Sequence, residues 1–134
     1  MTRYYTLPML GPMGTAAAAG GRVGVQLEDK DRVNAGIVAP QSGAVNIYII
    51  VSASQPRPNT QIYRGFCKGR GTFAEHWDPQ SGLTNISINQ PDTYHTVQVF
   101  SGIYLNEGEF LAIRITNRTE GYNFNLASIY MEYQ

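Results

Sequence analysis

The last third of the chain contains three apolar runs: Thr96-Val97-Gln98-Val99-Phe100, Phe110-Leu111-Ala112-Ile113-Arg114-Ile115-Thr116 and Asn123-Phe124-Asn125-Leu126-Ala127-Ser128-Ile129-Tyr130-Met131-Glu132-Tyr133. Glycine-containing turns separate the runs, at Ser101-Gly102 and at Asn106-Glu107-Gly108. Runs of β-branched and aromatic residues bounded by turn signals are typical of strands. This part of the sequence therefore predicts three packed strands and an all-β fold.

Short alternating runs also recur between turns earlier in the chain. In the longest of them, residues 44–54, Val45, Ile47, Ile49 and Val51 alternate with more polar positions. Short strands at intervals of about 8–12 residues, with no convincing helix, are typical of a sandwich or jelly roll. We therefore expect one antiparallel β-sandwich domain over residues 22–134, a jelly roll of about eight strands.

Composition narrows the class of function. The 134-residue chain has a formal net charge of zero and only 15% charged residues, against about 25% in typical soluble domains. Such low charge argues against a nucleic-acid binder that works through a broad basic face. Near-zero net charge also gives weak protection against association, which suits a chain that works within an assembly.

Cysteine content and hydropathy indicate in which cellular compartment the protein is expected. The single cysteine, Cys67, excludes an intrachain disulfide framework. No run approaches the roughly 20 apolar residues that a membrane-spanning helix needs. The first residues lack the apolar core of a signal peptide. We therefore expect a protein that is made in the cytoplasm, has no membrane contact and is not secreted through a signal peptide.

Residues 1–21 form a distinct segment that is rich in proline, glycine, methionine and alanine. Its prolines and glycines disfavour any long regular element. One interpretation is a disordered leader; the other, which we favour, is an extended arm that docks on a neighbouring subunit through apolar side chains. The arm residues expected at that interface are Tyr4, Tyr5, Leu7, Met9, Leu10 and Met13.

The last predicted strand carries apolar side chains on both faces. Simple alternation places Phe124, Leu126 and Tyr130 on one face, and Ala127, Ile129, Met131 and Tyr133 on the other. Because a two-layer sandwich shows water one polar face, we expect the outer face to be covered by the arm or by another subunit. A strand through the centre of the core is the alternative. Tyr130 and Tyr133 are accordingly candidate interface residues.

Candidate catalytic groups are few. Glu75-His76-Trp77-Asp78 gathers an imidazole and two carboxylates, but a catalytic zinc site needs a third protein ligand, and nothing places His95 nearby. Cys67 could pair with either histidine as nucleophile and base, although its flanks match no cysteine-hydrolase signature. The favoured alternatives are a strand end that enters an Asp-Pro turn and a structural thiol. We expect no metal, no cofactor and no enzymatic activity.

The segment 64–73 interleaves three cations, Arg64, Lys68 and Arg70, with aromatic residues and glycines. This pattern faintly resembles the signature of RNA-recognition modules, in which aromatic residues on a sheet stack on bases. The helices of that module have no counterpart in the sequence. We therefore favour a basic hairpin tip that contacts an acidic neighbour over contact with nucleic acid.

Two stretches resemble small jelly-roll proteins of phage and virus particles: Ala39-Pro40-Gln41-Ser42-Gly43-Ala44-Val45 and residues 105–115. Residues 105–115 also resemble the trimeric heads of the tumour-necrosis-factor/C1q type. The resemblance implies a capsid decoration (cement) or fibre-head protein, often trimeric. Such a protein would sit in the virion and hold neighbouring major capsid protein subunits together through a jelly-roll body and an arm.

The same C-terminal pattern resembles carbohydrate-binding modules of the galactose-binding type. Those modules also end with a glycine turn, an Ile-Arg-Ile-like strand and an Asn-containing final strand, as in Gly121-Tyr122-Asn123-Phe124-Asn125-Leu126. The resemblance implies a glycan that stacks on exposed aromatic residues, for which Tyr63, Trp77 and Tyr122 are the candidates. A structural virion protein is our first hypothesis from the sequence, a carbohydrate-binding module or glycan-binding fibre head is the alternative, and a small hydrolase is third.

Overall fold

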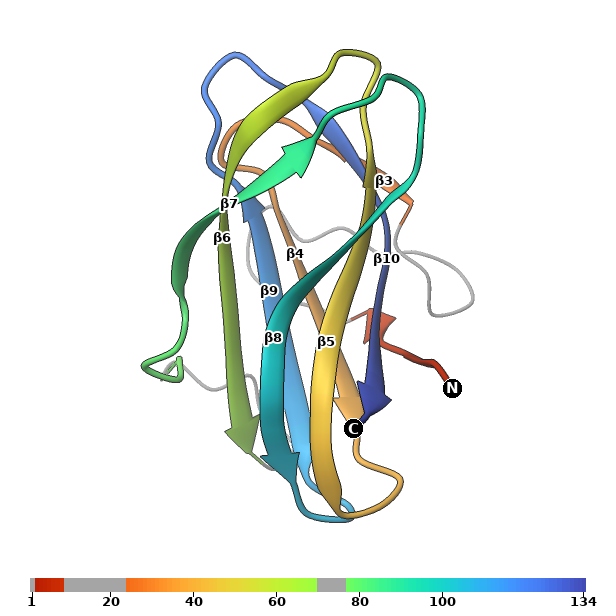
Figure 1. Cartoon of the computed structure of the whole chain (residues 1–134). Helices are drawn as coiled ribbons and strands as arrows, with labels where there is room; N and C mark the ends of the chain where they lie inside the picture. The colour runs from red at the N-terminus through yellow and green to blue at the C-terminus, as the bar shows by residue number, and fades with distance from the viewer. Residues whose placement is uncertain (1, 9–23, 70–76) are drawn as a thin grey trace.

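The computed structural model describes residues 2–8, 24–69 and 77–134. In these ranges the chain forms ten β-strands, arranged as two antiparallel sheets of five strands each, and no helix (Figure 1). The prediction of an all-β sandwich is confirmed. Within the same ranges there is consequently no helix long and apolar enough to cross a membrane.

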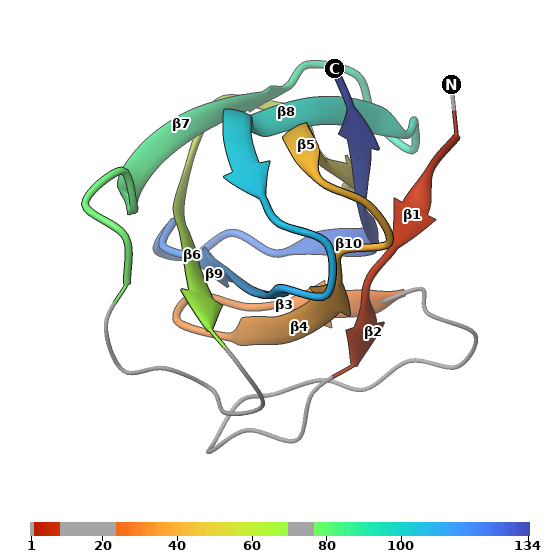
Figure 2. The same ribbon diagram turned by 90° about the horizontal axis from the view of Figure 1, so that it is seen from below.

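The strands alternate between the two sheets along much of the chain. Their bounds are β1 Tyr4–Tyr5, β2 Leu7–Pro8, β3 Val25–Leu27, β4 Arg32–Val38, β5 Gly43–Ser52, β6 Arg57–Gly69, β7 Gly82–Ile88, β8 His95–Leu105, β9 Phe110–Asn117 and β10 Phe124–Tyr133. Sheet A has the order β1-β10-β5-β8, and β3 also pairs with β10. Sheet B has the order β2-β4-β9-β6-β7. Figure 2, a view close to the strand direction, shows the two sheets wrapped around a common interior.

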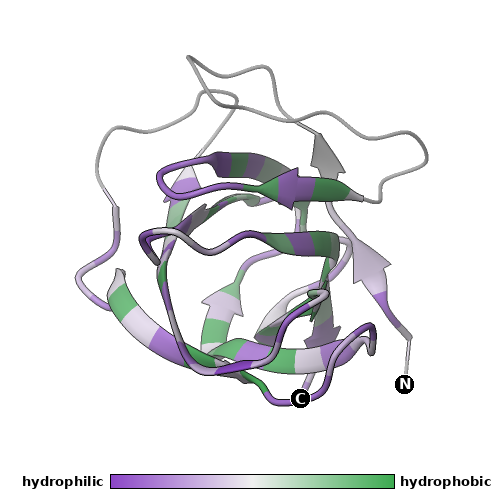
Figure 3. Ribbon diagram, turned by 90° about the horizontal axis from the view of Figure 1, so that it is seen from above, coloured by the Kyte–Doolittle hydropathy of each residue, from purple (hydrophilic) through white to green (hydrophobic). Residues whose placement is uncertain are grey.

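The core lies between the sheets and is built from alternate residues of the long strands, most regularly in β5. Val45, Ile47, Ile49 and Val51 of β5 are all 0% exposed, as the sequence predicted for one face of this strand. Sheet B contributes Leu111, Ile113 and Ile115 of β9, which are also fully buried. Alternating apolar and polar bands along the ribbons display the same pattern (Figure 3). Each such side chain stabilises the fold by roughly 1.5–3 kcal/mol through its removal from water.

Strand β10 does not keep a single alternation along its length. Its pairing with β5 shifts between Leu126 and Ser128, where a β-bulge inserts an extra residue. The bulge places Leu126 on the core side together with Ile129 and Met131, while Tyr130 lies on the outer face. The predicted grouping of Leu126 with Tyr130 is therefore wrong, because one inserted residue reverses the faces of everything after it.

The N-terminal residues pair with the chain's own sheets. Tyr4 and Tyr5 lie opposite Met131 and Tyr130 at the edge of sheet A, and β2 lies opposite Gly36 and Ala35 at the edge of sheet B. Thr6, between them, is 1% exposed. Its N–H and its hydroxyl both donate to the Ile129 carbonyl, at 3.2 and 3.3 Å. The segment thus passes from one sheet to the other and closes one side of the sandwich, as Figure 2 shows for β1 and β2.

This placement bears on the expected arm. Tyr4, Tyr5 and Leu7 take part in strands of this chain instead of leaving it, because their backbone groups complete the two sheet edges. Met9, Leu10 and Met13 lie outside the described residues. Docking of the segment 1–21 on a neighbouring subunit stays a prediction.

The outer face of sheet A carries a row of tyrosines that crosses three strands. Tyr5 of β1, Tyr130 of β10 and Tyr48 of β5 lie directly opposite one another. The Tyr130 ring stacks on Tyr48 with centroids 5.2 Å apart and contacts Tyr5 at 5.6 Å, and the Arg3 guanidinium lies 4.5 Å from its centroid. Tyr130 is only 2% exposed as a result. Its expected role at an intermolecular interface is not supported, because its own chain covers the ring.

Tyr133 is likewise engaged within the chain. Its ring meets Tyr4 edge-on, with centroids 5.9 Å apart, and its hydroxyl donates to the Gln41 carbonyl at 2.6 Å. These contacts tie the end of β10 to β1 and to the turn before β5. Tyr133 therefore holds secondary-structure elements of one chain together.

A cationic groove on the outer face of sheet B

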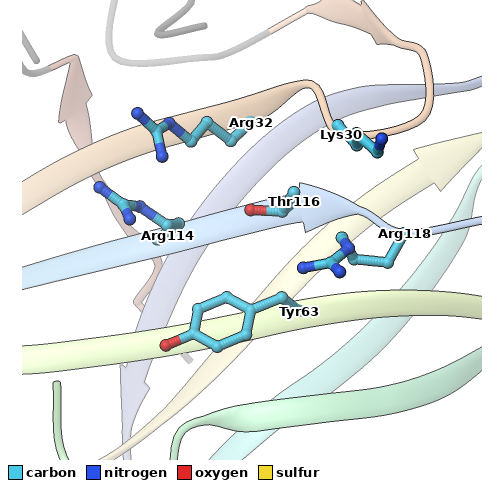
Figure 4. A pocket seen from close by; sticks show the side chains of 6 residues that line it. All are labelled: Lys30, Arg32, Tyr63, Arg114, Thr116 and Arg118. Carbon is cyan, nitrogen blue, oxygen red and sulfur yellow. The ribbon is translucent and has the colours of Figure 1, made fainter. Parts of the chain in front are cut away.

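The described residues form a groove of about 350 Å³ on the outer face of sheet B. It lies over β4, β9 and β6, and Figure 4 shows the lining side chains projecting from these strands and the turns beside them. The lining residues are Lys30, Arg32, Tyr63, Arg114, Thr116 and Arg118. We call this surface the cationic groove. Its volume falls within the range of about 300–1,000 Å³ that small-molecule sites occupy.

Strand register brings the lining together. Thr116 of β9 lies opposite Arg32 of β4 on one side and opposite Tyr63 of β6 on the other. Directly opposed residues share a face of an antiparallel sheet, so these three form one row across the strands. The next row along β9 contains Arg114, which lies opposite Asn34 and Gly65. Residues far apart in sequence thus form one surface.

Tyr63 lies flat along its own strand. A Cβ atom built on Gly65 would come within 2.8 Å of Tyr63 Cε2 and 2.9 Å of its hydroxyl oxygen. The ring therefore occupies the space that a side chain at position 65 would fill. Because Gly65 has none, the ring rests against the backbone of β6 and presents its other face toward the groove. Tyr63 is half-buried in this position.

Arg114 is held in place on two sides. Its Nε donates to Asn34 Oδ1 at 2.8 Å, and its guanidinium lies 4.7 Å from the centroid of the Trp77 ring. Burial, and then the positive charge of Arg32, lower the pKa of Arg114 from its ordinary value. Both effects penalise the charged form of the guanidinium.

Lys30, just before β4, and Arg118, just after β9, lie at one end of the groove. Backbone hydrogen bonds hold both residues in place. The Lys30 N–H donates to the Asn117 carbonyl at 2.7 Å, and the Arg118 N–H donates to the Gln61 carbonyl at 2.9 Å. Between them, the buried Asn117 amide nitrogen donates to the Leu27 and Tyr122 carbonyls at 3.0 and 2.7 Å. The turns that carry the two cations are thereby anchored, while the cationic side chains themselves are exposed.

The chemistry of the groove is that of an anion-tolerant, hydrogen-bond-donating surface. Among the described residues, its lining combines four cations, one aromatic ring and one hydroxyl, with no carboxylate from that part of the chain. Residues 2–8, 24–69 and 77–134 contain no cluster of three or more His, Cys, Asp or Glu side chains that could hold a metal ion. Binding and orientation of a polar ligand are what this arrangement can do.

Two of the six ligand-contact residues that the sequence predicted belong to this face. Tyr63 lines the groove, and Trp77 packs against Arg114 beside it. Arg64 and Lys68 lie on the opposite side of β6, because they pair with the core residues Ile115 and Leu111. Arg70 lies outside the described residues, as do Glu75 and His76.

Arg64 and Lys68 bridge the rims of the two sheets. The Arg64 guanidinium lies 4.8 Å from the centroid of the Phe100 ring, and its Nη1 donates to the Gln80 carbonyl at 2.9 Å. Lys68 Nζ donates to the Tyr104 carbonyl at 3.0 Å. Arg64 and Lys68 thus contact the sandwich edge, while Arg70 and the rest of the tip lie outside the described residues. Contact of this segment with an acidic neighbour stays a prediction.

Tyr122 is not an exposed stacking ring. It is 7% exposed, and its hydroxyl donates to the Gln55 carbonyl at 2.6 Å. Burial raises the pKa of its hydroxyl. The ring packs in the core and also lines a small pocket with Gln55 and Asn123, so a ligand contact at Tyr122 stays a prediction.

Sequence reasoning missed five of the groove residues: Lys30, Arg32, Arg114, Thr116 and Arg118. The sequence does indicate some of them, because polar residues alternate with apolar ones in the strands that carry them. In β4, Arg32 and Asn34 alternate with the buried Val33 and Ala35, and in β9, Arg114 and Thr116 alternate with core isoleucines. Polar residues on the same face of two strands indicate a shared surface once those strands are known to pair.

No protein-family model and no curated protein sequence matches the chain. Among solved structures, the fold is similar to a family 35 carbohydrate-binding module from Clostridium thermocellum, with a TM-score of 0.52, 13% identity, and coverage of 99% of this chain and 92% of that one. It is also similar to part of a GH26-CBM35 β-(1,4)-mannanase from Podospora anserina, with a TM-score of 0.50 and 14% identity. That match covers 99% of this chain but only 26% of the mannanase chain. The chain thus shares the jelly-roll sandwich of carbohydrate-binding modules.

Proposed function

We propose that this chain is a non-catalytic glycan-binding module and that the cationic groove receives the sugar. The observation that carries the proposal is the Tyr63 ring, laid over Gly65 in the same row as Thr116 and Arg32. One face of a sugar ring carries C–H groups, which pack on an aromatic face, while its hydroxyls need hydrogen-bond partners at the rim. The groove supplies both kinds of contact.

The fold supports the proposal as well. The solved structures that resemble the chain include modules described as carbohydrate-binding. Their likeness favours the glycan-binding alternative over capsid decoration, which was the first hypothesis from the sequence. Because fold alone does not assign function, the argument rests on Tyr63 and its neighbours.

Each neighbour of Tyr63 has a distinct task. The Thr116 hydroxyl both donates and accepts hydrogen bonds and therefore suits a sugar hydroxyl. The guanidinium groups of Arg32 and Arg114 offer several donors in a planar fork. Arg114 reaches the groove already oriented by Asn34 and Trp77, which reduces the entropy lost when a ligand binds.

Removal of the Tyr63 ring tests the proposal. We expect Tyr63→Ala to weaken binding by at least about 2 kcal/mol, or roughly thirtyfold, because a central aromatic contact is lost. The measurement is affinity electrophoresis in gels that contain mannan, xylan, galactan or polygalacturonate, followed by calorimetry with whichever polysaccharide retards the protein. The matched control is Tyr94→Ala, since Tyr94 is 69% exposed and does not line the groove.

Thermal unfolding of both variants checks that they remain folded. The proposal fails if none of the four polysaccharides retards the unmodified protein, or if a folded Tyr63→Ala variant binds as tightly as the parent. Loss of binding in Tyr94→Ala but not in Tyr63→Ala would move the site to another surface.

A further inference from the structure

We infer that the glycan is bound as an extended chain of several sugar units, and that a second hollow beside the cationic groove holds the units that follow the one on Tyr63. This inference rests on the proposed function and deepens it by naming the class of ligand, which is an oligosaccharide or polysaccharide chain instead of a single sugar. The position and the chemistry of the second hollow carry it.

The second hollow measures about 480 Å³ and lies over β6, β7 and the turn after β9. We call it the amide hollow, because its described lining includes three side-chain amides, those of Asn59, Gln61 and Asn85. The rest of that lining is Arg57, Arg118, Thr119 and Glu120. Arg118 also lines the cationic groove, and Figure 4 shows its side chain on the same face as Tyr63. The two hollows are therefore neighbours on one surface.

Strand β6 runs beneath both hollows. Tyr63, Gln61 and Asn59 occupy every second position of this strand, while Ile62 and Thr60 between them are 0% exposed. Alternate residues of a strand point to the same face, so the surface that carries the Tyr63 ring continues to Asn59. The strand from Tyr63 to Asn59 spans about 13 Å at about 3.3 Å per residue. This surface is longer than one sugar ring.

Pairing with the neighbouring strands widens this surface. Asn85 of β7 lies directly opposite Gln61, and on the other side the Gln61 carbonyl accepts the Arg118 N–H at 2.9 Å. These three residues form one row across the strands. The row beside it contains Leu83, Tyr63 and Thr116. A sugar chain that leaves the Tyr63 ring along β6 therefore meets the amides next.

The two rows offer different contacts to the same ligand. Tyr63 and Leu83, which is 55% exposed, present apolar surface to the C–H face of a sugar. The described lining of the amide hollow contains no aromatic ring, but its side-chain amides both donate and accept hydrogen bonds. Asn59, Gln61 and Asn85 are exposed, so a ligand can reach them. Sugar hydroxyls also donate and accept, and the units beyond Tyr63 can therefore pair with these amides.

The turn between the two hollows is held in place by its own hydrogen bonds. The Thr119 hydroxyl accepts the Gln61 N–H at 2.7 Å and donates to the Gln61 carbonyl at 3.0 Å. The Thr119 N–H donates to Asn117 Oδ1 at 2.9 Å. These bonds fix the turn that carries Arg118 against β6. Binding of a long ligand therefore requires little ordering of this turn, which reduces the entropy lost.

Chain length tests the inference on the full chain. The probes are oligosaccharides of one, two, four and six units prepared from mannan, xylan, galactan and polygalacturonate, and calorimetry measures their affinities. We expect six units to bind at least about tenfold more tightly than one, because about two further hydrogen bonds of ordinary strength give that factor. A single unit that bound as tightly as six would overturn the inference.

Amide variants locate the additional units. Gln61→Ala and Asn85→Ala change exposed side chains, so we expect both variants to fold normally and to lower the affinity for the six-unit ligand severalfold each. The ratio of the six-unit to the one-unit affinity should fall as well. The matched control is Gln98→Ala, which removes an exposed amide opposite Tyr48 on sheet A and should bind like the parent. Thermal unfolding checks that all three variants are folded.

The outcomes separate the two proposals. Equal affinity for one and six units, lost in Tyr63→Ala, would overturn the role of the amide hollow and leave the glycan-binding function standing. The same holds for a six-unit affinity that stays unchanged in folded Gln61→Ala and Asn85→Ala variants, or that falls as far in Gln98→Ala. Absence of binding to every oligosaccharide and to the four parent polysaccharides would overturn both proposals.

Discussion

The outer faces of the two sheets are built alike and are occupied differently. Each carries a row of side chains across three neighbouring strands: Tyr5, Tyr130 and Tyr48 on sheet A, and Arg32, Thr116 and Tyr63 on sheet B. On sheet A the chain's own β1 and Arg3 cover the central ring, which is 2% exposed. On sheet B the row lines a groove.

The comparison shows that aromatic content does not identify a binding face. Sheet A carries more tyrosines on its outer face, yet the rings of Tyr5, Tyr130 and Tyr48 pack against one another. Of the described residues that line the groove, only Tyr63 is aromatic, and its neighbours are cations and a hydroxyl. A ligand site is better indicated by an aromatic ring among unlike polar groups than by a cluster of aromatic rings.

The largest effect that separates the faces concerns stability. We expect Tyr130→Ala to lower the free energy of unfolding by about 3–5 kcal/mol, because it empties a buried site beneath Arg3, Tyr5 and Tyr48. Chemical denaturation measures the loss. The same change should leave the affinity for a glycan unaltered.

Tyr104→Ala is the control for that variant, because Tyr104 is 53% exposed; it should stay within about 0.5 kcal/mol of the parent. If Tyr130→Ala proved as stable as the parent, the ring would not be the covered centre of sheet A. If it lost glycan binding while folded, the assignment of roles to the two faces would be reversed.

A smaller effect concerns sheet B. Gly65→Ala places a methyl group where the Tyr63 ring lies, within 2.8 Å of Cε2, and the ring must move away from the strand. Because the displaced atoms belong to the free end of a side chain, we expect less than about 1 kcal/mol of stability to be lost. Affinity for the glycan should fall severalfold, and calorimetry measures it. Gly69→Ala, where nothing lies within 4 Å of the added atom, should bind like the parent.

The smallest effect is a dependence of stability on pH. Burial raises the pKa of Tyr130 and Tyr133 above the ordinary value of 10.0. A raised pKa in the folded state means that the unfolded chain releases these protons first. Stability is therefore fully present below pH 10 and falls as pH rises through the folded-state values.

Thermal unfolding between pH 8 and about 11 checks this expectation. Tyr130→Phe removes one of the titrating groups, so its unfolding temperature should depend less steeply on pH in that window. A parent protein whose stability rose through the same window would contradict the burial of these hydroxyls.

Much of the fold could be predicted because it depends on local alternation. The apolar positions of β5 and the turn at Gly108, which has a positive φ of 82°, follow from residues close together in sequence. The predicted turn at Ser101-Gly102 is wrong, because both residues lie inside β8, where its pairing with β5 shifts register. The bulge in β10 could not be predicted in this way. Nothing in Leu126-Ala127-Ser128 marks it, because an extra residue is accommodated by pairing with β5 and not by a special residue type.

The groove could be predicted only in part, because it is defined by strand pairing. Tyr63 was found as an aromatic residue on a strand, but its neighbours Thr116 and Arg32 are distant in sequence and meet it only through register. Arg64 was expected at a partner contact because it belongs to the cation-rich segment 64–73, which begins directly after Tyr63. Adjacent residues of a strand point to opposite faces. Tyr63 therefore faces the groove, whereas Arg64 lies on the other side of β6.

The crossing of residues 4–8 between the sheets has a mechanical consequence. Tyr4 pairs with Met131 at the edge of sheet A, close to the last residue of the chain. A load applied through the two ends of residues 2–134 would pull neighbouring antiparallel strands apart at one end, so their hydrogen bonds would break one after another instead of together. We therefore expect β1 to peel from β10 at low force. The two hydrogen bonds from Thr6 to Ile129 would be the first obstacle before the second sheet is opened.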